Sequence, residues 1–152
     1  MSTSQLPDIH VVPTAAVPGV TWRIVTAIVT GALAASAYYG SWYLTEEVAT
    51  RQLPVGPPQF LPGSGWGFGA LALLILVAAP MTVACLTAIA GHSAAAVAAM
   101  VAGALLMGWI VVQVLLIGVV FWLQPAMLVA GAVVLALGMW AYHPQAVRST
   151  GP

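Results

Sequence analysis

Charged side chains are scarce in this sequence. Only six of its 152 residues are charged, and lysine and asparagine are absent. These six are Asp8, Arg23, Glu46, Glu47, Arg51 and Arg148. A soluble domain devotes about a quarter of its residues to charge, so this chain cannot cover a water-facing surface in that way. The net charge of zero also excludes the basic field that attracts nucleic acid. We therefore expect the lipid bilayer to be its principal partner.

The motifs of common active sites are missing as well. The sequence contains no P-loop, no GxSxG, no HExxH and no GxGxxG following a strand. Cys85 is the single cysteine, so no intrachain disulfide can form, and we expect it to pack as a small side chain. His10, His92 and His143 show no spacing that holds a metal. We therefore predict no metal, no cofactor and no enzymatic activity.

Long apolar segments are what the sequence does contain. Hydrophobic residues make up 62% of it, and a helix needs about 20 apolar residues to cross hydrocarbon about 30 Å thick. Four segments reach this length: 22–43, 66–90, 93–118 and 123–142. Because none of them alternates between apolar and polar residues, helices rather than strands are favoured. We predict an all-α integral membrane protein, an up-down bundle of four transmembrane helices within residues 22–142.

The remaining segments are polar or rich in proline. We expect a flexible or interfacial tail over residues 1–21, a long proline-rich loop over 44–65 and a short tail over 143–152. A cleaved signal peptide is the alternative for the first helix, but the long lead before Arg23 is against it. Two arginines on the side of the tails, against one in the loop, favour cytoplasmic termini. We assign the chain to a bacterial plasma membrane.

Four residues at helix ends and bends have expected structural roles. Pro80 should kink the second helix. Ser93 should cap the N-terminus of the third helix, and Pro125 suits the first turn of the fourth. Gln124, at the interface just before Pro125, should cap a helix end or be solvated.

Small residues recur at a spacing of four, a pattern that lets helices approach closely. The pairs are Gly31/Ala35, Ser36/Gly40, Gly63/Gly67 and Gly65/Gly69. The fourth helix has Gly131 and Gly138, which are seven apart instead. Contacts inside one bundle explain these residues, and a homo-oligomer is an open alternative.

Gln113 interrupts the apolar stretch GWIVVQVLLIGVVFWLQP, residues 108–125. Trp109, Gln113 and Ile117 fall on one helix face. An amide that faced lipid would lack hydrogen-bond partners, at a cost of roughly several kcal/mol. Gln113 should therefore face a neighbouring helix and form an interhelical hydrogen bond, or contact a ligand in an outward pocket.

Three parts of the sequence carry a resemblance. GWIVVQVLLIG is followed by WLQP and then by Gly131, six residues after Pro125, and PGSGWGFGALALL lies upstream. Together they resemble an uncharacterised family of small four-helix integral membrane proteins of bacteria, over about residues 60–140. The resemblance implies an all-helical membrane fold. It implies no activity, because none is assigned to that family.

Aromatic residues are concentrated toward the long loop. Ten of the thirteen lie in that half of the predicted bundle or in the loop itself. An aromatic belt with loop packing accounts for them, and the alternative is an outward-facing aromatic cleft that binds a ligand. The candidate residues of that cleft are Gln113, Trp109, Glu46, Glu47, Arg51, Trp42 and Trp66.

Three functions remain open at this point. The first is a non-enzymatic accessory or scaffolding component, whose partner is another membrane protein or a second copy of the chain. The second is a binder or carrier of an apolar small molecule or lipid through the aromatic cleft. The third is an enzyme on a lipidic substrate, with Glu46 or Glu47 as acid or base. The missing catalytic motifs favour the first, and the lack of charge at mid-membrane disfavours ion-coupled transport.

Overall fold

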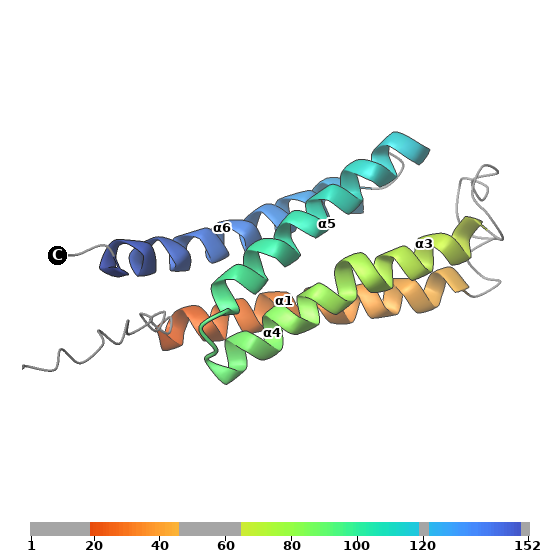
Figure 1. Cartoon of the computed structure of the whole chain (residues 1–152). Coiled ribbons are helices and arrows are strands. Elements are labelled where there is room, and N and C mark those ends of the chain that lie inside the picture. The colour runs from red at the N-terminus through yellow and green to blue at the C-terminus, as the bar shows by residue number, and fades with distance from the viewer. Residues whose placement is uncertain (1–18, 46–64, 119–121, 150–152) are drawn as a thin grey trace, which may run out of the picture.

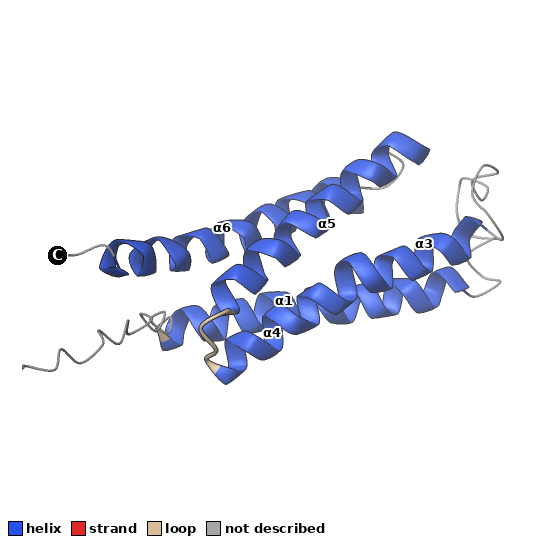
Figure 2. Cartoon of the chain, viewed as in Figure 1, coloured by secondary structure: helices blue, strands red, loops and turns tan. Residues whose placement is uncertain are grey.

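A computed structural model describes residues 19–45, 65–118 and 122–149 of the chain, and their regular structure is helical (Figure 2). The elements are α1 (Val20–Thr45), α3 (Gly65–Leu73), the π-helical turn η1 (Leu74–Ala78), α4 (Ala79–Ala90), α5 (Ala95–Ile117) and α6 (Leu123–Ser149). Since α3, η1 and α4 follow one another without interruption, they form one continuous helix. The described residues thus contain four helices long and apolar enough to cross a membrane. This confirms the predicted four-helix bundle.

The four helices run up and down and form two hairpins (Figure 1). In one hairpin α1 packs along α3, η1 and α4, and in the other α5 packs along α6. One end of the bundle, which we call the turn end, holds Gly19, the turn at residues 91–94 and the end of α6. The opposite end, which we call the loop end, holds Thr45, Gly65 and Gly118. The hairpins contact each other through α4, η1 and α5, and they diverge toward the loop end.

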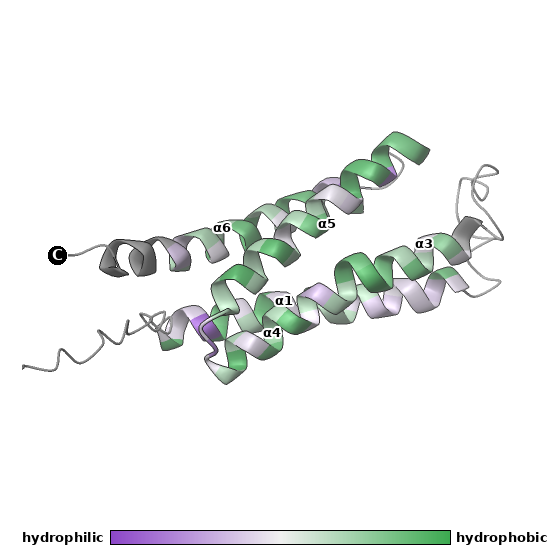
Figure 3. Cartoon of the chain, in the orientation of Figure 1, coloured by the Kyte–Doolittle hydropathy of each residue, from purple (hydrophilic) through white to green (hydrophobic). Residues whose placement is uncertain are grey.

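Hydrophobic residues occupy much of each helix (Figure 3), and they are found on the outside of the bundle as well as in its interior. Ile28, Leu86, Leu115 and Val129 are each about as exposed as a surface residue of a soluble protein, with exposed fractions between 59% and 79%. In water such a surface would cause aggregation, whereas in hydrocarbon it needs no cover. The interior contains mainly alanine and glycine, so the helices meet at short distances.

Pro80 changes the helix type rather than ending the helix. The residues just before it, Leu74–Ala78, form the π-helical turn η1, and the Ala79 N–H donates to the Leu74 carbonyl five residues back. Proline has no N–H, and its ring clashes with the carbonyl four residues earlier, here Leu76. Widening the turn by one residue relieves that crowding.

The turn between α4 and α5 closes with a Schellman motif. Gly91 has φ +66°, a conformation that favours glycine, and its N–H donates to the Ala88 carbonyl at 3.2 Å. The His92 N–H donates to the Thr87 carbonyl at 2.9 Å. The expected cap at Ser93 is wrong, because Nδ1 of His92 accepts from the Ala94 N–H at 3.1 Å and Ala94 holds the cap position.

Three of the four helices begin or end outside their expected spans, whereas α5 is shorter than the expected 93–118. The largest difference is in α6, which continues to Ser149, beyond its apolar span of Leu123–Tyr142. Pro144 lies within this extension. A proline removes one backbone hydrogen bond, but glutamine, alanine and arginine, which follow it, are good helix formers.

Candidate functional site

Helix α5 presents two stripes of residues to the rest of the bundle. The first stripe contacts α6: a Cβ on Gly138 would lie 2.7 Å from the Met100 nitrogen, and one on Gly131 would lie 2.8 Å from the Met107 side chain. The first stripe is Ala96, Met100, Gly103 and Met107. The second stripe lies beside it on the side of α4 and η1, and its buried members are Ala95, Ala99, Ala102, Leu106 and Trp109. By its spacing, half-buried Gln113 continues this stripe. Spacings of three and four residues keep each stripe on one face.

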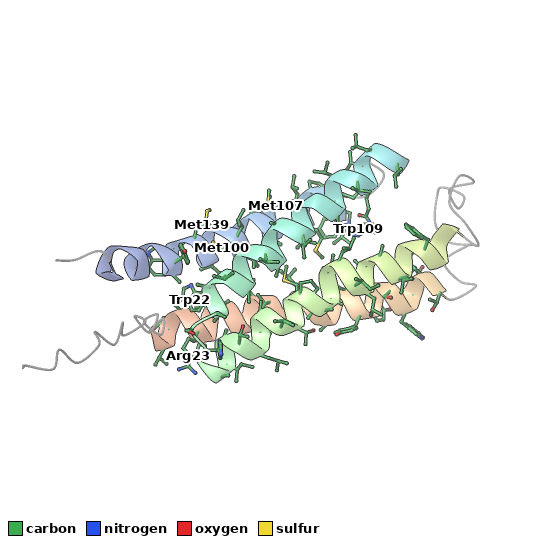
Figure 4. All side chains as sticks on the ribbon, viewed as in Figure 1. Trp22, Arg23, Met100, Met107, Trp109 and Met139 are labelled. Carbon is green, nitrogen blue, oxygen red and sulfur yellow. The ribbon has the colours of Figure 1, made fainter. Side chains whose placement is uncertain are left out.

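Trp109 is the last buried residue of the second stripe toward the loop end (Figure 4). Its side chain is 8% exposed and belongs to the cluster that contains Ala34 and Ala37 of α1 and Val77 and Ala78 of η1. The indole Nε1 is buried and has no hydrogen-bond partner. Trp22 provides the contrast, because its buried Nε1 donates to the Leu137 carbonyl of α6 at 2.8 Å. A buried donor without an acceptor costs about 1–3 kcal/mol.

Gln113 lies one helical turn after Trp109, nearer the loop end. Its side chain is half-buried, and it forms no hydrogen bond with any residue that the structure describes. The interhelical hydrogen bond expected from the sequence is therefore not found among the described residues. From Gln113 toward the turn end, α5 packs against α4 and η1. It has at most slight contact with α3, because α3 and α5 diverge toward the loop end (Figure 1).

The other residues of the predicted cleft lie elsewhere or outside the described part of the chain. Trp42 is on α1, 57% exposed, with its ring centroid 5.9 Å from that of Tyr39. Trp66 is in α3, but its side chain is not among those described. Glu46, Glu47 and Arg51 lie outside the described residues. The structure thus brings Trp109 and Gln113 together on one face, and it leaves Trp42 on a lipid-exposed face of the neighbouring hairpin.

The predicted structural residues have the following surroundings. Gln124 is 5% exposed, and its Nε2 donates to the Gly118 carbonyl at the end of α5 at 3.2 Å, so it is buried and bonded rather than solvated. Pro125 lies in the first turn of α6. Gly131 lies against Gly103 and Met107 of α5.

Two contacts at the turn end were missed from the sequence. Arg23 of α1 donates from Nε to the Ala88 carbonyl at 3.0 Å and from a terminal nitrogen to the Ile89 carbonyl at 2.5 Å. Its cation thus lies at the negative end of the α4 helix dipole, beside Gly91 (Figure 4). An up-down topology places the start of α1 next to the end of α4, and this was the signal available in the sequence. Arg23 is the one charged side chain among those described.

The Gly103 contact was also missed. A Cβ on Gly103 would lie 2.6 Å from the Leu135 nitrogen and 2.7 Å from the Gly131 carbonyl oxygen, so the α5 and α6 backbones touch here. Ala99 and Gly103 are a small-residue pair at a spacing of four, but this spacing does not reveal that Gly103 meets Gly131 on another helix. Gly69, a member of a predicted pair, has nothing within 4 Å of such a Cβ.

Most other polar side chains in the described spans bond within the bundle. The Ser41 hydroxyl donates to the Ala70 carbonyl at 2.9 Å, and the Cys85 thiol donates to the Ala27 carbonyl at 3.3 Å. The hydroxyls of Tyr38 and Thr82 lie 3.2 Å apart. Cys85 also lies 3.3 Å from the position of a Cβ on Gly31, so it packs as a small residue between α1 and α4.

The described residues contain no cluster of three or more histidine, cysteine or acidic side chains that could hold a metal ion. His92 lies in the turn before α5, where its Nδ1 accepts from the Ala94 N–H. His10 lies outside the described residues, and the side chain of His143 is not described.

The comparisons with known proteins give no match. No protein-family model, no curated protein and no solved structure matches it. The function is therefore argued from the residues of this chain alone.

Proposed function

We propose that this chain is a non-enzymatic accessory or scaffolding protein of a membrane, and that its apolar surface binds the partner. The observation that carries the proposal is where the polar groups go. The polar side chains of Trp22, Arg23, Ser41 and Cys85 each bond to a backbone carbonyl of another helix. They hold the bundle together, and they are not gathered at a site. The surface left for partners is the apolar outside of the helices.

We further propose that the protein resides in the plasma membrane of a bacterium, with both termini in the cytoplasm. The orientation is supported by the arginines: Arg23 and Arg148 share the turn end, whereas Arg51 belongs to the segment that joins α1 and α3 at the loop end. We likewise propose that the chain belongs to the family of small four-helix bacterial membrane proteins. The GWIVVQVLLIG and WLQP stretches support this proposal.

A co-purification experiment tests the scaffolding function. The tagged chain, expressed at its native level, is purified in a mild detergent, and the proteins and lipids that accompany it are identified by mass spectrometry. We expect a stoichiometric membrane-protein partner. To tie that partner to the apolar surface, leucine is introduced at exposed small residues on three helices, as Ala35→Leu, Gly108→Leu and Ala132→Leu.

Each of these variants should leave the bundle folded, because the added side chain points away from it, and Gly108 has nothing within 4 Å of a Cβ. At least one variant should release the partner. The scaffolding proposal fails if the chain is purified without any stoichiometric protein, or if all three variants retain the partner as the unaltered chain does.

A second function is favoured by one observation, the unpartnered indole N–H of Trp109. A ligand that brings an acceptor would satisfy this buried donor, as a binder or carrier of an apolar small molecule or lipid requires. Purification of the chain without a protein, but with one enriched lipid or small molecule, would favour this second function over the first.

A further inference from the structure

We propose that Trp109 and Gln113 bind an uncharged, membrane-soluble molecule through its carbonyl oxygen, which accepts a hydrogen bond from the Trp109 indole. The inference rests on the second function above and deepens it by naming the site and the chemistry of the ligand. It replaces the wide aromatic cleft expected from the sequence with two side chains on one stripe of α5.

The first step is the missing acceptor. The indole N–H of Trp109 can donate a hydrogen bond and cannot accept one. The side chain is 8% exposed, and its nitrogen is buried without a hydrogen-bond partner. Trp22, in the same bundle and equally buried, does find a carbonyl. The group that completes the Trp109 site must therefore bring an acceptor oxygen.

The acceptor oxygen must reach Trp109 from a side of α5 that α6 does not cover. The α6 side of α5 is closed, because backbone atoms meet there at the Gly103 contact. Trp109 lies instead on the stripe that faces α4 and η1, and it belongs to the same buried cluster as residues of these elements. Toward the loop end this stripe loses its neighbour, because α3 diverges from α5 and has at most slight contact with it (Figure 1). We place the ligand on this side of α5, within the membrane. Because the indole nitrogen is buried, the side chains around it must shift to admit the oxygen of the ligand.

The third step is the charge and depth of the site. Arg23, the charged side chain among those described, is at the opposite end of the bundle (Figure 4). An ionised ligand would find no counter-charge here among the described side chains, so a neutral ligand fits. Trp109 lies about 12 Å and Gln113 about 6 Å from the loop end of α5, at about 1.5 Å per residue. If the loop end of α5 lies at the membrane surface, Trp109 lies in the hydrocarbon region and Gln113 lies near its edge.

The fourth step is the role of Gln113. Its amide offers two N–H donors and one oxygen acceptor, one helical turn closer to the membrane surface than Trp109. It can donate to the same carbonyl or to a second oxygen of the ligand. Two molecules supply this chemistry in a bacterial membrane: the acyl ester of a phospholipid, and the ring carbonyl of a quinone. Both present a neutral carbonyl attached to a long apolar chain.

The test follows the indole N–H signals of ¹⁵N-tryptophan protein in nanodiscs. The reference nanodiscs contain dialkyl phosphatidylcholine, an ether lipid that lacks the ester carbonyl. The first arm uses diacyl phosphatidylcholine with the same chain lengths, and the second adds decyl benzoquinone to the ether-lipid nanodiscs. Trp109→Phe identifies the Trp109 signal by its loss. Trp22 is the internal control, since its N–H already has an acceptor.

We expect the Trp109 proton to move downfield in one of the two arms, and that arm identifies the source of the carbonyl. The Trp22 signal should stay in place. In the arm that responds, Trp109→Phe and Gln113→Leu should each weaken binding by about two- to tenfold, the effect of one lost hydrogen bond. Trp140→Phe, on a 68% exposed position of α6, is the matched variant and should leave binding unchanged.

Two results would overturn the proposal. One is a Trp109 proton that stays in place in both arms. The other is a Trp109 proton that is already downfield in the ether lipid, because water or protein would then supply the acceptor. The unaltered chain carries both arms, so neither result depends on whether a variant folds. If lipid or quinone binds but Trp109→Phe has no effect, the ligand-binding function stands and this site is wrong.

Discussion

Replacing Gly103 with alanine tests the contact on which the α5–α6 hairpin depends. The new Cβ would lie 2.6 Å from the Leu135 nitrogen and 2.7 Å from the Gly131 carbonyl oxygen. Both are backbone atoms, so no side-chain rotation can relieve the clash. The two helices must move apart at this contact.

The size of the effect follows from these distances. Ordinary contact begins at 3.4 Å, so the helices must separate by roughly 0.7 Å, and a gap of about this size loses about a quarter to a half of the dispersion attraction of each contact that it opens. Overpacking of a core costs about 1–3 kcal/mol, and replacing a helical glycine returns about 1 kcal/mol. We expect Gly103→Ala to lower the free energy of unfolding by about 0–2 kcal/mol, and by about 1–3 kcal/mol relative to a glycine-to-alanine change at an open helical position.

The assay is reversible denaturant unfolding in mixed micelles, followed by circular dichroism. Gly108→Ala is the matched control on the same helix, since nothing lies within 4 Å of its Cβ position, and it should be neutral or stabilising. Gly131→Ala should fall between the two, because its nearest neighbour, at 2.8 Å, is the flexible Met107 side chain. Equal stability of the Gly103→Ala and Gly108→Ala variants would refute the reasoning.

Three further variants test other contacts by the same unfolding measurement. Arg23→Gln removes a cation from the last carbonyls of α4 and should cost about 1–2 kcal/mol, of which Arg23→Lys should recover part. Gly91→Ala would place a Cβ 2.7 Å from the Arg23 guanidinium carbon and hold alanine at φ +66°. It should lower the free energy of unfolding by about 1–2 kcal/mol. Additive losses in the double variant with Arg23→Gln would argue against this shared contact. Trp22→Phe leaves the Leu137 carbonyl without its side-chain donor and should cost about 1 kcal/mol, and an unchanged midpoint would show that this hydrogen bond contributes nothing.

The helices could be predicted from the sequence because their cause is local. A segment of about 20 apolar residues in lipid must satisfy its own backbone, and a helix does so without reference to any other part of the chain. The end of α4 at Gly91 was equally readable, since a glycine there can adopt a positive φ. Ser93 misled the prediction because α5 begins after Ala94, which holds the cap position without a side-chain cap hydrogen bond.

The candidate site could be predicted only in part. The spacing of four residues places Trp109 and Gln113 on one face of α5, and the structure describes them there. The spacing does not reveal whether either side chain finds a hydrogen-bond partner. That depends on where α3, η1 and α1 lie, and these come from the other hairpin.

By itself, then, the sequence determined that the chain enters a membrane, how many times it can cross and where most of its helices end, because each of these follows from the hydropathy and backbone chemistry of consecutive residues. The tertiary structure decided which glycines meet, which carbonyls Arg23 and Trp22 bind, and that the Trp109 indole has no partner. Each of these is a contact between helices, and contacts at 3 Å depend on how far two helices are rotated and shifted against each other, which no single segment encodes.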